Sequence, residues 1–237
     1  MPRIPSDLSL GRAEVPASRI AMPATILHVK TENADYRHIE QSYDQGSDDY
    51  SDHFQQPHDF IEPDRQEFIR QLPPGSQILD CGCGPGMDTE KFFHLGYQVT
   101  ALDLSERFVR LTKTRAPGAT VRQMDMRFLD FPAATFDGLW ASFSLLHIRA
   151  ADVEQTFSGF KRVLRPAGLF FTAVHRGRTT QWVKTTISGM ERHTYVQEWV
   201  QAEIEVRVKS AGFRILQSRP FVRTGGRYPL LSILAQS

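Results

Sequence analysis

Short apolar runs alternate with amphipathic stretches along most of the chain. The runs are rich in branched and aromatic residues, and their length predicts buried strands at residues 77–80, 97–103, 120–124, 136–143 and 168–174. Apolar residues that recur every three or four positions predict helices at residues 63–72, 87–95, 105–115, 152–164 and 198–211. Strands that alternate with helices favour a parallel sheet covered on both faces.

The two ends of the chain depart from this alternation. Residues 1–33 hold four prolines and no sustained period, so we expect a mostly disordered tail before a single domain at 34–237. Near the other end, residues 213–222 and 228–234 predict two strands around Gly225-Gly226, which indicates an antiparallel hairpin. Within the alternating part, Asp152 with Gln155 predicts a capping box at a helix start.

Composition narrows the class of protein. The 237 residues are 41% hydrophobic and 23% charged, which is typical of a soluble globular domain, and the formal charge of +1 gives no global attraction to nucleic acid or membrane. No apolar run approaches the roughly 20 residues of a membrane span, and no secretory signal is visible, so we expect a cytoplasmic protein without a membrane partner. The two cysteines, Cys81 and Cys83, form no disulfide framework, and we expect no metal site.

The most informative stretch is residues 77–87, QILDCGCGPGM. An apolar run ends at Asp80, and three glycines precede the helix at 87–95, which together make a nucleotide-type site facing a helix N-terminus. The spacing fits neither the dinucleotide fingerprint nor a P-loop. An acid at this place suits a positively charged ligand better than phosphates. The alternative is an ordinary glycine-rich turn between a strand and a helix.

The order acid-x-G-x-G-x-G resembles motif I of the class I S-adenosylmethionine-dependent methyltransferases of the small-molecule type. The resemblance implies S-adenosylmethionine as cofactor and a Rossmann-like, doubly wound, mostly parallel seven-stranded sheet with a C-terminal antiparallel hairpin. In that family, the acid at Asp103 binds both ribose hydroxyls, and Asp125 accepts from the adenine amino group. The cofactor-binding residues that the resemblance implies are Asp80, Cys81, Gly82, Gly84, Gly86, Asp103, Leu104, Asp125, Met126 and Ser142.

Three residues are candidates for the chemistry. Tyr43, in the polar and aromatic segment 36–60, resembles part of a Tyr-Asp…Tyr-Asp segment that folds over the cofactor; the alternative is a surface helix carrying two half-buried tyrosines. His147 belongs to an ending, SLLHI, that resembles one seen in small-molecule members, and is either a base or a packing residue. His175 follows a strand and begins a long connection, 175–198, which we expect to be a substrate lid, or else a solvated basic loop.

We therefore expect methyl transfer to a heteroatom or carbanion of a small-molecule metabolite. The Asp/Asn-Pro-Pro-Tyr signature of amino-group methyltransferases is absent from the sequence, and the composition does not favour nucleic acid as a partner. Two alternatives remain. One is methylation of a tRNA or rRNA base, and the other is a regulator that binds S-adenosylmethionine without transferring the methyl group. The sequence does not indicate an oligomeric state or identify the acceptor.

Overall fold

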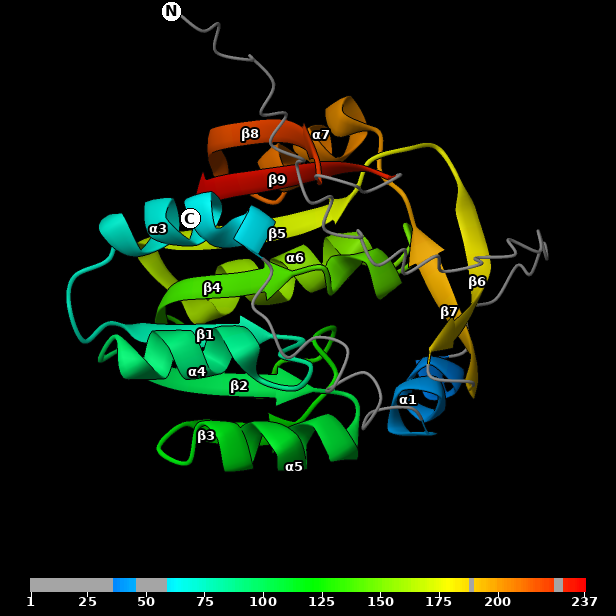
Figure 1. Cartoon of the computed structure of the whole chain (residues 1–237). Coiled ribbons are helices and arrows are strands. Elements are labelled where there is room, and N and C mark those ends of the chain that lie inside the picture. The colour runs from blue at the N-terminus through cyan, green and yellow to red at the C-terminus, as the bar shows by residue number, and fades with distance from the viewer. Residues whose placement is uncertain (1–35, 46–58, 188–189, 224–227) are drawn as a thin grey trace, which may run out of the picture.

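A mixed seven-stranded sheet forms the centre of the computed structural model, which describes residues 36–45, 59–187, 190–223 and 228–237 (Figure 1). The strand order is β3-β2-β1-β4-β5-β9-β8. The first five strands in this order are parallel, while β9 runs antiparallel to both of its neighbours. The bounds are β1 Gln77–Cys81, β2 Gln98–Asp103, β3 Thr120–Gln123, β4 Phe136–Ser142, β5 Leu164–His175, β8 Arg214–Val222 and β9 Pro229–Gln236.

Helices cover both faces of the sheet, as the alternation predicts. One face packs against α3 (Glu62–Arg70), α4 (Met87–His94) and α5 (Glu106–Arg115), and the other against α6 (Val153–Val163) and α7 (Gln201–Ser210) (Figure 1). Successive residues of β1 point to opposite faces, so Leu79 joins the α6 side while Ile78 joins the α4 side. No helix in the described part of the chain is long and apolar enough to cross a membrane.

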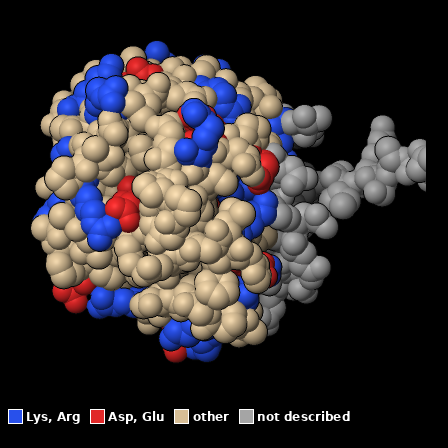
Figure 2. All heavy atoms as spheres, turned by 90° about the vertical axis from the view of Figure 1, so that its left-hand side faces the viewer, with Lys and Arg blue, Asp and Glu red and all other residues tan. Residues whose placement is uncertain are grey.

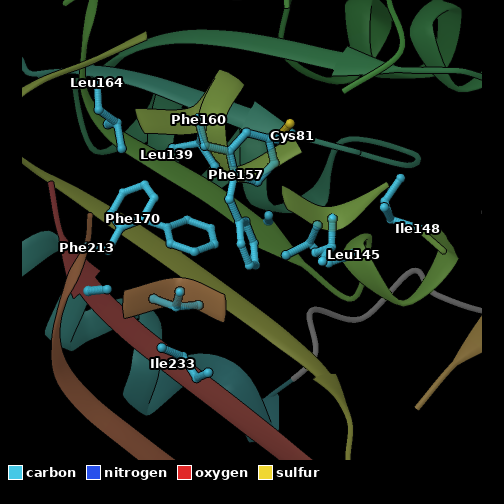
Figure 3. Packing of buried hydrophobic residues seen from close by; sticks show 14 of the residues in the cluster. Cys81, Leu139, Leu145, Ile148, Phe157, Phe160, Leu164, Phe170, Phe213 and Ile233 are labelled. Carbon is cyan, nitrogen blue, oxygen red and sulfur yellow. The ribbon is translucent and has the colours of Figure 1, made fainter. Parts of the chain in front are cut away.

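The core on the α6 side is dominated by aromatic rings. Phe157 and Phe160 of α6 both contact Phe170 of β5, with ring centroids 5.6 and 5.5 Å apart, and Phe170 in turn contacts Phe213 (Figure 3). On the opposite face, the ring of Trp140 stacks on Phe171 of β5. This core holds β4 and β5 rigidly, so the ends of these strands can position a site.

The start of α6 differs from the sequence prediction. Asp152 is the residue before α6, but its side chain makes no capping hydrogen bond. Its carboxylate instead accepts hydrogen bonds from Tyr36 and Arg149, each at 2.6 Å. The capping box at this position is therefore wrong, because two charged or polar partners from outside the helix compete for the same oxygens. The strand after α6 also begins earlier than predicted, at Leu164.

The long connection after β5 forms a hairpin of its own. β6 (Thr180–Ile187) and β7 (Met190–Gln197) pair antiparallel in a separate two-stranded sheet. The hairpin packs against α1 (Tyr36–Gln45) and against the 3₁₀ turn η2 (Leu145–His147). In Figure 1, α1, β6 and β7 lie beyond the carboxyl ends of the parallel strands. The expected disorder of residues 1–33 lies outside the described residues, and so does Tyr50, the second tyrosine of the predicted Tyr-Asp…Tyr-Asp segment.

Candidate functional site

The glycine turn after β1 has the backbone conformation that its composition suggests. Gly82 has a φ of +80°, and a Cβ added there would lie 2.4 Å from the Cβ of Ser144. Gly84 has a φ of +52°, and a Cβ there would meet nothing within 4 Å. Gly82 therefore allows the turn to pass tightly against the segment before η2, whereas Gly84 presents its backbone to open space.

Asp103, at the end of β2, ties this turn to the next helix. One carboxylate oxygen accepts from the Gly84 N–H and the other from the Ser105 N–H, both at 2.9 Å. Burial raises the pKa of Asp103 to about 6, even though these two hydrogen bonds favour the ionised form. The carboxylate thus fixes the geometry of the turn and still borders the cavity described next.

A cavity of about 1030 Å³, its open mouth included, lies between this turn and α1. Ten of the thirteen residues that the sequence singles out line it, which are Tyr43, Asp80, Gly82, Gly84, Asp103, Leu104, Asp125, Met126, Ser142 and His147. Cys81, Gly86 and His175 are not among the lining residues that the structure describes. Cys81 is fully buried in the core beneath the turn, and the left-handed Gly86 precedes α4.

The lining is acidic. Among the described residues around the cavity, five carry carboxylates and none is a lysine or arginine, the five being Glu40, Asp80, Asp88, Asp103 and Asp125. Asp80 is buried and accepts from the Thr89 hydroxyl at 2.5 Å. Burial, with the neighbouring Asp88, raises the pKa of Asp80 above its ordinary value of 3.8. Arg65 pairs with Asp88 and Arg127 pairs with Asp125, so Glu40, Asp80 and Asp103 are the carboxyl groups that favour a positively charged ligand.

Asp125 has a partner that the sequence did not reveal. Arg127 binds its carboxylate through Nε at 3.0 Å and Nη2 at 2.5 Å, and the Arg127 guanidinium lies 3.3 Å from the ring centroid of Tyr36. The Tyr36 hydroxyl bonds Asp152 and receives the N–H of Arg149 at 3.1 Å. These contacts attach α1 to the strand ends, so α1 forms one wall of the cavity.

Tyr43 and His147 meet across the cavity wall. The Tyr43 hydroxyl lies 2.7 Å from Nε2 of His147, and Nδ1 of the same ring lies 2.7 Å from the backbone oxygen of Tyr195 in β7. Burial lowers the pKa of His147 to about 4, so the imidazole is neutral at pH 7. The two candidates from distant parts of the sequence are therefore brought together.

His175 occupies a different environment. Its ring stacks on Tyr228 at 5.6 Å with an interplanar angle of 5°, and it faces Phe143 at 6.3 Å. Burial lowers the pKa of His175 below its ordinary value. Phe143 lines the cavity, so His175 stands one side chain behind the wall. Arg178 is exposed. A catalytic role for His175 stays a prediction.

The residues of the cavity fit the cofactor that the sequence implies. Ser142 belongs to the lining, and its buried hydroxyl has no hydrogen-bond partner among the described residues. Asp103 and the open face of Gly84 would hold the ribose side, and the acidic lining suits a sulfonium and an ammonium. Sequence reasoning missed the cavity residues Ile39, Glu40, Ser105 and Phe108, whose roles depend on α1 folding over the turn.

Comparison with known proteins agrees with this geometry. A family model described as "Methyltransferase domain" matches residues 79–172. An uncharacterized methyltransferase of Synechocystis is 26% identical over 181 residues, covering 72% of this chain and 84% of its own length. A ubiquinone biosynthesis O-methyltransferase of Xanthomonas axonopodis is 27% identical over 178 residues, covering 68% of this chain and 73% of its own.

Solved structures share the fold. The 1,6-didemethyltoxoflavin-N1-methyltransferase of Burkholderia thailandensis, which was crystallised with its substrate and S-adenosylhomocysteine, superposes with a TM-score of 0.71 at 20% identity. The superposition covers 92% of this chain and 97% of that one. The family match, the relatives and the shared fold together support the assignment of the chain as a class I S-adenosylmethionine-dependent methyltransferase.

Proposed function

We propose that this methyltransferase acts on a heteroatom of a small-molecule metabolite. The observation that carries the proposal is the cavity itself, which α1 covers on one side and which extends past the glycine turn to Tyr43, Phe143 and His147. Its lining joins the glycine turn to aromatic and polar side chains, a mixture that is typical of small-molecule sites. A cofactor held at the turn would bring an acceptor beside Tyr43 and His147.

The charge of the site argues against a nucleic acid as acceptor. A polynucleotide needs basic side chains along its path, whereas the described lining residues of the cavity include five carboxylates. Figure 2 shows the face away from α1 and the cavity, where charged side chains are scattered over a mostly uncharged surface. A neutral or cationic small molecule meets no such penalty.

The relatives support the same substrate class. The name of the Xanthomonas relative assigns it to ubiquinone biosynthesis as an O-methyltransferase, and the Burkholderia structure contains 1,6-didemethyltoxoflavin. Both names refer to small-molecule acceptors. Since these similarities are modest, they support the size class of the acceptor rather than its identity.

When bound, the cofactor supplies an electrophilic methyl group. The chain's own residues then bind and orient the reactants and exclude water. Asp103 and the glycine turn hold the cofactor side, while α1 and η2 shield the opposite side of the cavity.

The proposal is tested with purified enzyme, methyl-labelled S-adenosylmethionine, a low-molecular-mass metabolite extract and, in parallel, total tRNA and rRNA. We expect label in the metabolite fraction. Label in RNA, with binding that weakens steeply as salt rises, would replace the proposal by the nucleic-acid alternative. Cofactor binding without transfer to any fraction would favour a regulator.

A further inference from the structure

We propose that Tyr43, oriented by His147, accepts the hydrogen bond of the reacting group, so that the acceptor is an uncharged hydroxyl or ring N–H compound and not a carboxylate. This inference rests on the proposed small-molecule function and narrows its substrate class. It follows from one chain of hydrogen bonds and from the charge of the cavity lining.

The orientation begins at β7. The backbone oxygen of Tyr195, 2.7 Å from Nδ1 of His147, is a carbonyl and can only accept. Nδ1 must therefore carry the proton of the neutral imidazole. Nε2 is left with a lone pair, and the group 2.7 Å from it is the hydroxyl of Tyr43. The tautomer of His147 is thus determined by a strand of the β6–β7 hairpin.

The hydroxyl of Tyr43 has a single proton, and this geometry commits that proton to Nε2. Toward every other group, the phenol oxygen can only act as an acceptor. Tyr43 and His147 both line the cavity that holds the cofactor-binding residues. A molecule bound there meets a phenol oxygen that can accept a hydrogen bond from a donor but repels another acceptor. Hydroxyl and N–H groups satisfy it, whereas a carboxylate does not.

The charge of the lining discriminates in the same direction. Five carboxylates border the cavity, and no lysine or arginine among the described residues borders it to pair with an anionic acceptor. Two of the five carboxylates are already paired, Asp88 with Arg65 and Asp125 with Arg127. No described lining residue offers a further counter-charge, so a carboxylate acceptor would be desolvated beside Glu40 and Asp103 at a cost. The lining therefore disfavours the same class of acceptor as the Tyr43–His147 pair.

The Tyr43–His147 pair also accepts the proton that the reacting atom loses. As the reacting oxygen or nitrogen forms its bond to the methyl carbon, the C–S electron pair stays on sulfur. The proton of the reacting atom passes to Tyr43 Oη, and the Tyr43 proton passes to His147 Nε2. The imidazolium formed carries the positive charge that the sulfonium loses, and its low pKa then returns the proton to solvent. This route suits reacting atoms that become strongly acidic on methylation, as a hydroxyl does.

The orientation is tested without turnover by ¹⁵N NMR of histidine-labelled enzyme. We expect His147 to show a protonated Nδ1 and an unprotonated Nε2 at pH 7, with the Nε2 signal shifted in Tyr43→Phe. A protonated Nε2, or an imidazolium at pH 7, would overturn the proposal. This readout does not depend on finding an acceptor, so it stays decisive even if the small-molecule function proves wrong.

The substrate class is tested by the product. Label transferred to a metabolite extract should resist mild alkali, as ethers and N-methyl groups do, and release as methanol from methyl esters would refute the inference. On the acceptor found, Tyr43→Phe should lower kcat by about 100-fold while the S-adenosylmethionine Kd changes by less than about threefold. Equal kcat in Tyr43→Phe would remove Tyr43 from the reaction.

Matched variants separate orientation from bulk. His147→Gln places an amide oxygen that can still accept from Tyr43, so it should retain more activity than His147→Leu. Equal loss in both variants would contradict the orienting role. Tyr97→Phe serves as the control, because the Tyr97 hydroxyl bonds the Ile69 carbonyl at 3.3 Å and does not line the cavity.

Discussion

Asp103→Ala is the perturbation that most directly tests the cofactor site. In the wild type, Asp103 accepts two backbone N–H groups at 2.9 Å, from Gly84 and Ser105, and borders the cavity. The substitution should therefore weaken cofactor binding, because the ribose side loses its acceptor and the glycine turn loses its anchor.

The expected magnitude follows from these bonds. A hydrogen bond to a charged group contributes about 1.5–3 kcal/mol. Loss of one such contact to the ligand corresponds to about a 10- to 150-fold higher Kd, at about 1.4 kcal/mol per tenfold. The bonds to the turn also stabilise the fold, and losing about 2 kcal/mol from a chain of this size should lower the Tm by roughly 4–8 °C.

The assay is calorimetric titration with S-adenosylmethionine and S-adenosylhomocysteine at a temperature well below the Tm of the variant. Asp130→Asn is the control, because its side chain is 89% exposed and pairs with Arg122 outside the cavity. An unchanged Kd in Asp103→Ala would refute the assignment. NAD should bind neither protein.

The pH dependence supplies a second readout. The pKa of Asp103 is about 6 in the folded chain, against its ordinary value of 3.8, because burial disfavours its charge. Cofactor affinity should rise as pH increases through about 6, since the carboxylate is the better acceptor. Without cofactor, the native state keeps this proton between about pH 3.8 and 6 while the unfolded chain loses it. This group's contribution to stability therefore falls as pH rises through that window. Asp103→Asn should remove both effects.

Three further variants test the surroundings of the site. Gly82→Ala should lower the Tm by more than Gly96→Ala in thermal melts, because both glycines have positive φ but only at Gly82 would the new Cβ meet a neighbour, Ser144, at 2.4 Å; equal losses would refute the close approach. Tyr36→Phe removes the hydroxyl that bonds a carboxylate and a backbone N–H beyond α1, so amide exchange in α1 should accelerate by about tenfold while the sheet is unaffected. His175→Ala should lower kcat more than it weakens cofactor binding, because its ring packs against Phe143 in the cavity wall, and unchanged turnover would exclude an effect of His175 on the reaction.

The local pattern predicted the scaffold well. The order of strands, glycine turn and helices depends on periodicities of a few residues, and the structure confirms the doubly wound sheet with its antiparallel end. The acid and glycines of residues 80–86 also predicted the enzyme family and its cofactor, which the comparisons confirm. A turn with this composition has few conformations open to it, so neighbouring residues suffice to determine it.

Contacts between distant segments could not be predicted from the sequence, for a physical reason. Asp152 has the local signature of a helix cap, yet Tyr36, 116 residues away, binds its carboxylate. Similarly, Asp125 reads as an open acceptor, whereas Arg127 binds it under the ring of Tyr36. A polar side chain bonds the strongest partner that lies close to it. Which partners lie close is decided by packing rather than by sequence spacing.

The sequence by itself determined that parallel strands bring their terminal acids to one edge around a glycine turn, because strand direction and turn chemistry are local properties. Only the tertiary structure decided how that edge is covered. The packing of α1 and the β6–β7 hairpin brings Tyr43 to His147 across 104 residues and selects the protonated nitrogen of the imidazole. That choice depends on a backbone carbonyl, which carries no side-chain signature in the sequence.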